Sequence, residues 1–135
     1  MTSLNFKNSS VYILDDDHIL PIVPNSIGNY VLGYSDMGVF NLMYVGRSDT
    51  DLQKEIQAQG ANKQKKFDKK LYTHFMFDTS AKTPEEAYYK ECTNYHDFIS
   101  YFNPKQGGNE IHPALPEGNK YKDIKCPVRI CDYHY

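Results

Sequence analysis

The sequence predicts a single α/β domain in which helices flank a small, mainly antiparallel central sheet. Two segments rich in aromatic and β-branched residues, separated by a short polar turn, are typical of a β-hairpin. A later segment begins with a helix-capping signal, and the residues of its inward face follow at intervals of four, which is typical of a helix. The length of 135 residues is enough for one hydrophobic core and favours one domain over two.

Composition and charge exclude several classes of protein. Hydrophobic residues make up 40% of the chain, enough for a packed interior. The net charge of -2 excludes a globally basic nucleic-acid coat, so any contact with nucleic acid must be local. No apolar run approaches the roughly 20 residues of a membrane span, and the first ten residues lack the pattern of a signal peptide. We therefore expect a soluble, cytoplasmic protein without membrane contact.

The first 25 residues are expected to extend a core that spans about residues 26–128. Residues 11–14 (VYIL) predict a short strand or an edge extension. The three aspartates that follow, together with Pro21 and Pro24, predict a loop.

The hairpin is predicted from residues 28–34 (GNYVLGY) and 39–46 (VFNLMYVG), with a turn at 35–38 (SDMG). An antiparallel pairing of these segments brings Tyr30 and Tyr44 onto neighbouring strands. Without further information, such tyrosines are interpreted as cross-strand packing in the core.

A short helix is predicted after the hairpin. Leu52 and Ile56 lie four residues apart, as on the inward face of a helix, behind three cap-forming residues at 48–50. Gly60 is expected to end this helix.

A basic loop over residues 62–70 and a third strand over 71–77 (LYTHFMF) are expected next. The lysines of the loop are either a local phosphate-binding patch or an ordinary solvated segment, and both interpretations stay open. These lysines are Lys63, Lys65, Lys66, Lys69 and Lys70.

The clearest helix signal covers residues 83–102. Thr83 and Glu86 form a capping box, Pro84 suits the first helical position, and the spacing places Glu91 on an otherwise apolar face. The rest of the chain predicts an irregular wrap with one possible short strand near 124–131.

Five short motifs resemble the GIY-YIG nuclease family in their order and spacing, and in particular its compact single-domain bacterial members. GNY at 28–30 stands in the place of GIY, and YVG at 44–46 in the place of YIG. Matching segments follow as GRSDTDL, EAYYKECTNYHDF and GNEIHPALP, with a late CP. The resemblance covers about residues 26–128.

The resemblance implies an endonuclease that hydrolyses DNA phosphodiester bonds with Mg²⁺ or Mn²⁺. It implies that Tyr30 or Tyr44 activates or orients the attacking water, and that Arg47 contacts phosphate through its planar fork. Glu91 would hold the metal ion, and Asn109 would help to place the phosphate or the loop around it.

Three further residues are expected to support this site. Gly46 closes the YVG motif, and His96 and His112 lie in segments that resemble the family and are expected to brace the site by hydrogen bonds.

One residue departs from the family pattern. Members usually carry an arginine three residues beyond the position of Leu52, where this chain has Glu55. Losing one such donor costs about 2.7 to 4 kcal/mol of transition-state stabilisation. Glu55 would repel a phosphate unless it points outward or joins Glu91 as a second metal ligand. The alternative function is therefore a catalytically impaired homologue that binds nucleic acid or a protein partner.

The cysteines offer a weaker signal. Three cysteines cannot all pair within one chain, which agrees with a reducing compartment. Cys126, Cys131 and His134 suggest a zinc site, but the pattern lacks a fourth ligand. Free thiols in a packed tail are the favoured interpretation.

Overall fold

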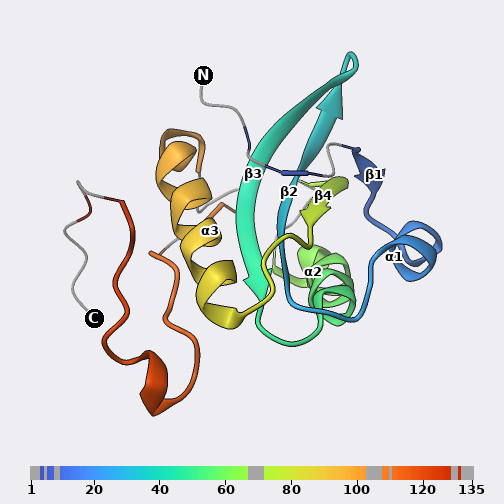
Figure 1. Cartoon of the computed structure of the whole chain (residues 1–135). Helices are drawn as coiled ribbons and strands as arrows, with labels where there is room; N and C mark the ends of the chain where they lie inside the picture. The colour runs from blue at the N-terminus through green and yellow to red at the C-terminus, as the bar shows by residue number, and fades with distance from the viewer. Residues whose placement is uncertain are drawn as a thin grey trace.

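The computed structural model describes residues 4, 6, 7, 10–66, 72–102, 108, 109, 111–128 and 131, with the backbone alone for 61–66. Within this part of the chain the fold is α/β, with a four-stranded antiparallel sheet and three α-helices (Figure 1). The strands are β1 (Tyr12–Ile13), β2 (Gly28–Asp36), β3 (Val39–Ser48) and β4 (His74–Asp78). The helices are α1 (Asp16–Ile22), α2 (Leu52–Lys66) and α3 (Pro84–Asp97). The predicted fold class is confirmed at this level.

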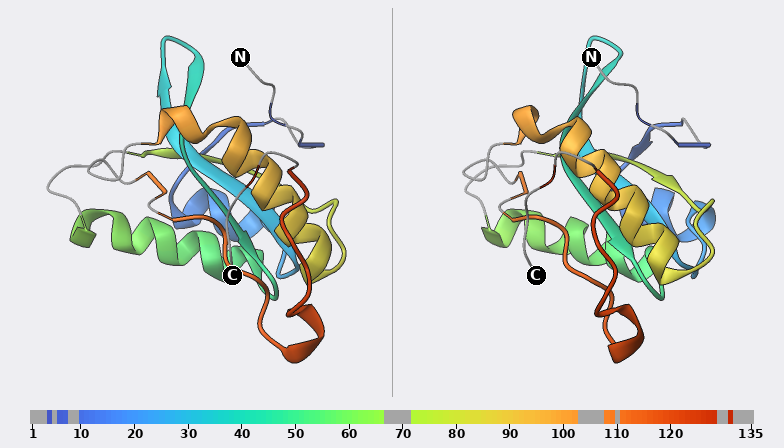
Figure 2. Two further views of the ribbon diagram at one scale, coloured as in Figure 1. Left: turned by 90° about the vertical axis from the view of Figure 1, so that its left-hand side faces the viewer. Right: turned by 60° about the vertical axis from the view of Figure 1, so that its left-hand side comes forward.

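The sheet has the strand order β1-β4-β2-β3, so β3 is an edge strand. Figure 2 shows the sheet between α2 on one side and α3 on the other. Successive residues of a strand point to opposite faces. Tyr30 and Leu32 therefore face α2, whereas Asn29 faces α3 and donates a hydrogen bond to the carbonyl oxygen of Ala87 (2.9 Å).

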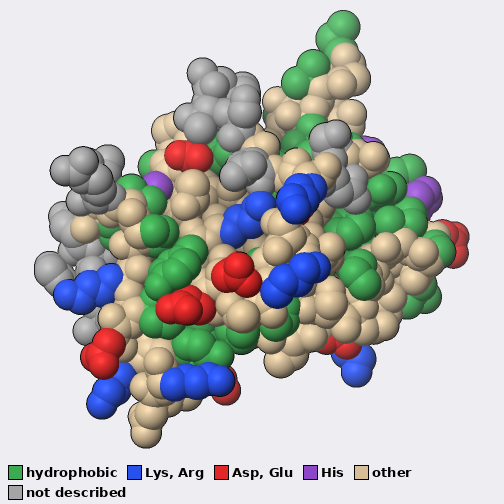
Figure 3. All heavy atoms as spheres, viewed as in Figure 1, with side chains coloured by type: hydrophobic (Ala, Val, Ile, Leu, Met, Phe, Trp, Pro, Cys, Tyr) green, Lys and Arg blue, Asp and Glu red, His purple; other side chains and the backbone are tan. Residues whose placement is uncertain are grey.

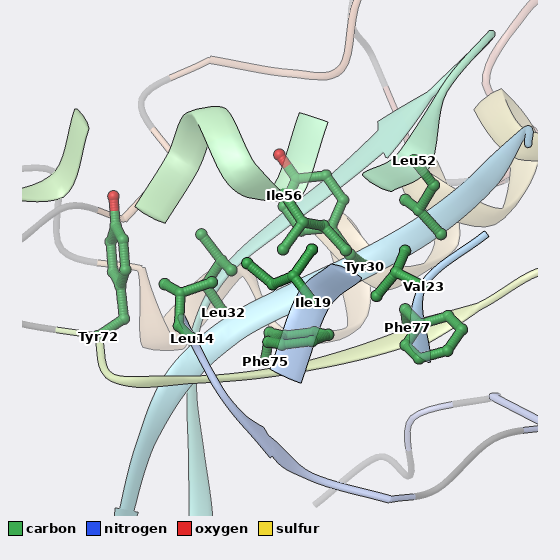
Figure 4. Close-up of a cluster of buried hydrophobic side chains, with 10 residues drawn as sticks. All are labelled: Leu14, Ile19, Val23, Tyr30, Leu32, Leu52, Ile56, Tyr72, Phe75 and Phe77. Carbon is green, nitrogen blue, oxygen red and sulfur yellow. The ribbon is translucent and has the colours of Figure 1, made fainter. Parts of the chain in front are cut away.

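The main hydrophobic core fills the space between the sheet and helices α1 and α2 (Figure 4). Leu52 and Ile56 of α2 are fully buried, as their spacing predicts. The hydroxyl of Tyr30 points out of this core toward α2. The ten residues of the cluster are Leu14, Ile19, Val23, Tyr30, Leu32, Leu52, Ile56, Tyr72, Phe75 and Phe77.

The predicted hairpin is confirmed, but its turn is tighter than expected. The strands continue to Asp36 and from Val39, which leaves Met37 and Gly38 as a two-residue turn. Both residues have positive φ angles, of 51° and 79°, as the tight turns that match strand twist require. The tip projects beyond the rest of the surface with Met37 and Val39 exposed (Figure 3).

The loop predicted after the first strand is wrong, because residues 16–22 form the helix α1. Asp15 caps this helix by accepting a hydrogen bond from the backbone N–H of His18 (3.0 Å). Pro21 lies near the end of the helix, where its missing N–H removes only one helical hydrogen bond. The stabilisation from the Asp15 cap therefore exceeds the cost of the hydrogen bond lost at Pro21, and the helix forms.

Helix α2 begins and ends elsewhere than predicted. Asp51 occupies the cap position, since its side chain accepts from the N–H of Lys54 (3.1 Å), and Ser48 instead stabilises the preceding turn. The helix continues through Gly60 to Lys66 because the following residues are good helix formers. Residues 62–66 of the predicted basic loop are thus helical, and residues 67–70 lie outside the described part of the chain.

The third strand and the long helix are confirmed with shifted ends. Strand β4 occupies His74–Asp78, and α3 begins after its cap Thr83, which accepts from the N–H of Glu86 (3.1 Å). After Asp97 the chain continues as a short 3-10 turn rather than as α-helix. Residues 124–128 form no strand, and 129 and 130 are not described.

An ion pair between a partly exposed lysine and a buried aspartate joins α3 to the sheet. Lys90 of α3 lies 3.0 Å from the carboxylate of Asp78, at the end of β4. Asp78 also accepts from the backbone N–H of Lys7 (2.7 Å) and from Ser80, and these contacts outweigh burial and lower the pKa of its carboxyl. The pairing sets the position of the next residue along the helix, Glu91.

Gly46 lets the Tyr30 side chain lie across β3. The two residues are direct partners in the β2–β3 register. A methyl group at Gly46 would lie 2.5 Å from the Tyr30 hydroxyl oxygen and 2.7 Å from a ring carbon. Because those distances are too short for real contacts, only glycine fits here.

None of the helices in the described residues is long and apolar enough to cross a membrane.

We predict that Gly46→Ala lowers the free energy of unfolding by about 1–3 kcal/mol, because the added methyl group must displace the Tyr30 ring. Gly60→Ala is the matched control. Its methyl group would lie 3.6 Å from Leu14, an ordinary contact in a helix interior. It should stabilise the chain by about 0.5–1 kcal/mol. Urea denaturation measures both, and equal effects of the two substitutions would contradict the packing at Gly46.

Candidate functional site

The candidate site lies at the edge strand β3, whose side chains reach both faces of the sheet. The register pairs Tyr44 with Leu32 and Arg47 with Asn29. Tyr44 therefore lies on the α2 face and Arg47 on the α3 face. Because β3 has no neighbouring strand on its outer side within the described sheet, groups from the two faces can interact around this edge.

Arg47 binds two carboxylates at once. Its Nε and Nη2 donate to Asp49 at 2.8 and 3.2 Å, and its Nη1 donates to Oε1 of Glu91 on α3 at 2.6 Å. The guanidinium also lies over the ring of Tyr88, 5.3 Å from the centroid. Burial alone would lower the pKa of Arg47, but the hydrogen bonds and charges of Asp49 and Glu91 raise it. The donor fork is therefore occupied by protein carboxylates.

Glu91 is the buried acid of the site, with 8% of its surface exposed. Burial raises the pKa of its carboxyl to about 7, against the lowering effect of Arg47 and with smaller raising effects from Asp49 and Glu55. A carboxylate with a pKa this close to neutrality is typical of functional sites.

Tyr30, Tyr44 and Glu55 form the other half of the site. The Tyr30 hydroxyl donates to Oε2 of Glu55 at 2.8 Å, and the side-chain amide of Gln59 donates to the same hydroxyl at 3.1 Å. The Tyr30 and Tyr44 rings stack with their centroids 6.2 Å apart. Glu55 thus points into the site and not outward.

Both phenols remain protonated at neutral pH. Burial, and then the neighbouring Tyr44 and Glu55, raise the pKa of Tyr30. Burial, and then Glu91 and Glu55, raise the pKa of Tyr44 to about 12. Tyr30 is fully buried, whereas Tyr44 is partly exposed, so Tyr44 is the phenol that solvent can reach.

The site holds three carboxylates and one guanidinium, which favours binding of a cation. The donor set of Asp49, Glu55 and Glu91 is all oxygen, as Mg²⁺ prefers. Of the two Glu91 oxygens, Oε1 accepts the bond from Arg47, and Oε2 accepts none from the described residues. Within the described chain these acids do not converge at the spacing of a closed metal cage. They fit an ion that is held by one carboxylate and retains several waters.

Asn109 lies at the outer edge of β3. Its side-chain amide accepts from the N–H of Val45 at 2.9 Å and donates to the carbonyl of Val45 at 2.9 Å. These are the hydrogen bonds that a neighbouring strand would make at an edge. Asn109 therefore joins the C-terminal segment to the YVG strand.

His96 and His112 are not hydrogen-bonded to Arg47 or Glu91 by any contact that the structure describes. They lie instead beside Cys126 and Cys131, and one ligand atom from each of the four residues lies within 4.8 Å of the others. This His/Cys group is a candidate metal-binding cluster that is separate from Glu91.

The five lysine side chains of the predicted basic patch all lie outside the described part of the chain. Lys63, Lys65 and Lys66 belong to the last turns of α2 by their backbone. Lys69 and Lys70 lie outside the described residues. Their role in binding phosphate stays a prediction.

The structure places Tyr30, Tyr44, Arg47 and Glu91 near one another, and sequence reasoning misses two of their partners. Asp49, which the sequence suggests only as a helix cap, is the main partner of Arg47. Its two-residue spacing from Arg47 in RSD is the signal that could have found it. The hydrogen bond from Tyr30 to the glutamate of α2 has no such signal, because it joins residues 25 positions apart.

Comparisons with models of known protein families, with curated proteins and with solved structures found no match.

We predict that the stability of the metal-free chain falls with rising pH because of Glu91. Between the ordinary pKa of a glutamate, 4.5, and its folded value of about 7, the folded state binds a proton that the unfolded state releases. The free energy of unfolding should fall by on the order of 2 kcal/mol from about pH 5 to about pH 8, relative to Glu91→Gln.

The measurement is urea denaturation of both proteins across this pH range in the presence of a chelator. Parallel pH curves for the two proteins would show that Glu91 titrates with an ordinary pKa.

Proposed function

We propose that the chain is a nuclease of the GIY-YIG type that hydrolyses DNA phosphodiester bonds with the help of a divalent metal ion. The main support is that Tyr30, Tyr44, Arg47 and Glu91, from β2, β3 and α3, lie in one electrostatically coupled group. These are the residues to which the family resemblance assigns the catalytic and metal-binding roles. A hairpin followed by helices on both faces of the sheet agrees with the same type.

Each side chain has a role that its surroundings suit. Tyr44 is partly exposed and protonated, and its hydroxyl orients the attacking water. Tyr30 is buried and holds Glu55 in place through its 2.8 Å hydrogen bond. Of Tyr30 and Glu55, the carboxylate of Glu55 is the group that accepts the proton of the attacking water. Arg47 binds phosphate when substrate oxygens replace Asp49 in its donor fork.

Glu91 would hold the metal ion, with Asp49 and Glu55 adding to the negative charge around it. A bound Mg²⁺ or Mn²⁺ supplies Lewis-acid stabilisation of the charge that develops on the phosphate. The excess of carboxylates repels a phosphate in the metal-free chain, so cleavage requires the added ion.

We predict that the purified chain nicks or linearises supercoiled plasmid in the presence of Mg²⁺ or Mn²⁺ and that chelation abolishes cleavage. Glu91→Ala should lower the rate by at least about a hundredfold, since one charge-stabilising group in a transition state contributes that much. Glu117→Ala removes an exposed glutamate and is the matched control. Cleavage that Glu91→Ala leaves unchanged would exclude the proposed site.

The second candidate function is binding without cleavage, and the position of Glu55 favours it. Glu55 lies where the family carries an arginine, and it points into the site against Tyr30. With the Arg47 fork also occupied, no described cation of the site is free to stabilise the transition state. In this alternative the site binds nucleic acid or a protein partner and is catalytically impaired.

Glu55→Arg separates the two functions, because one predicts that this substitution lowers plasmid cleavage and the other predicts that it raises it. If Glu55 is the proton acceptor, the substitution abolishes plasmid cleavage. If the chain is impaired, the wild type is inactive and the variant gains cleavage through the restored guanidinium. Glu55→Gln is the control, because it removes the charge without adding a guanidinium.

We predict that the lysines of residues 63–70 supply affinity for duplex DNA. Replacing all five with alanine should make the salt dependence of binding shallower, by about 0.9 in log–log slope for each phosphate that the variant no longer neutralises. Fluorescence anisotropy over a range of salt concentrations measures the slope. Lys122→Ala with Lys125→Ala, two exposed lysines of the C-terminal segment, is the control. Equal slopes for the wild type and the five-lysine variant would assign these lysines to solvation alone.

A further inference from the structure

A second cluster of reactive side chains, which includes neither Arg47 nor Glu91, lies where the C-terminal segment runs beside α3 (Figures 1 and 2). His96 belongs to the last turn of α3, and His112, Cys126 and Cys131 come from the segment that follows. One donor atom from each of the four lies within 4.8 Å of the other three. We propose that these four side chains bind one structural Zn²⁺ ion.

The spacing of the donor atoms fits a tetrahedral ion. Zinc bonds of about 2.3 Å to sulfur and 2.0 Å to nitrogen place tetrahedral ligand atoms roughly 3.3–3.8 Å apart. The Sγ of Cys131 and the Nε2 of His112 are 3.4 Å apart. The remaining separations, up to 4.8 Å, require only a small contraction around the ion.

The hydrogen bond of His112 prepares its ring for a metal. Its Nδ1 lies 2.9 Å from the carbonyl oxygen of Pro113. A carbonyl oxygen only accepts, so Nδ1 carries the proton, and the neutral ring presents the lone pair of Nε2 to Cys131 and the rest of the cluster. Zinc-binding histidines are oriented in this way, by donating their second ring nitrogen to a carbonyl or carboxylate.

The chemistry of the four donors selects zinc over the ion proposed at Glu91. Two thiols and two imidazoles are soft or borderline ligands, which favour zinc, whereas Mg²⁺ prefers oxygen. The four residues between Cys126 and Cys131 also fall within the usual spacing of zinc-binding cysteine pairs. His134, which the sequence suggests as a ligand, lies outside the described residues, and the cluster is complete without it. Four protein ligands fill a tetrahedron, so the ion has a structural role.

The cluster is partly buried and has an aromatic neighbour. His112 is buried, and the Tyr95 ring meets the His96 and His112 rings edge-on, with centroids 5.3 and 5.4 Å away. The Tyr95 ring therefore helps to hold the two imidazoles in place beside the ion.

The ion would fix the segment that carries Asn109. His96 precedes Asn109 in the chain and His112 follows it, so one ion attaches both sides of this segment to the end of α3. Asn109 in turn forms two hydrogen bonds with Val45 of the edge strand. Zinc bound at the cluster would thereby support the strand that carries Tyr44, without touching that residue.

The first test is metal analysis of the 135-residue chain, purified without added chelator, followed by titration of the metal-free chain with Co²⁺. We expect about one zinc per chain, as for a closed site. We also expect a Co²⁺ spectrum with tetrahedral ligand-field bands and a thiolate-to-cobalt charge-transfer band. A chain that takes up neither ion, or a Co²⁺ complex without the thiolate band, would overturn the proposal.

Variants then assign the ligands. The double variant Cys126→Ser/Cys131→Ser should lose the zinc and the thiolate band, and chelation should lower the melting temperature of the wild type but not of this variant. Cys92→Ala removes the third cysteine and should retain the metal. Loss of zinc from Cys92→Ala and not from the double variant would contradict the assignment. A Cys126–Cys131 disulfide in the freshly isolated chain would also contradict the assignment of these cysteines as zinc ligands.

The variant Glu91→Ala distinguishes zinc bound at the cluster from a metal ion bound at the candidate active site. The variant should retain its zinc whether or not it cleaves DNA, because Glu91 is not one of the four ligands. Zinc lost with Glu91→Ala would mean that the metal binds at Glu91 and not at the cluster.

Discussion

The pairing of β2 with the edge strand β3 is the constraint on which both halves of the candidate site depend. Its register sets Gly46 opposite Tyr30, which gives the Tyr30 ring room to cross β3 and present its hydroxyl to α2. The same register sets Arg47 opposite Asn29, on the face that α3 covers. A shift of one residue would exchange the faces and separate Arg47 from Glu91.

The electrostatics follow from this arrangement. One guanidinium is shared between Asp49 and Glu91, while burial raises the pKa of Glu91 to about 7. Removing both charged partners from water is costly, so the pair contributes less to stability than its short distance suggests. A carboxylate that changes charge near neutral pH responds readily to a nearby cation or phosphate, which is the property that the proposed function uses.

Local chemistry explains why parts of this fold are predictable from sequence. The hairpin and α3 follow from turn, cap and spacing signals within a few residues. Helix α1 escapes prediction because Pro21 argues against a helix, although its Asp15 cap argues for one. The hydrogen bonds of Asn109 with Val45, and the approach of Cys131 to His112, join distant positions. Such contacts depend on how the elements pack, and no local pattern encodes them.

The two hydrogen bonds of Asn109 have a consequence for assembly. The outer side of an edge strand presents free N–H and C=O groups, onto which a strand of another molecule can add. At Val45 the Asn109 amide already occupies that position. The same side chain that links the C-terminal segment to β3 thus closes this position of the edge to a strand from a second copy.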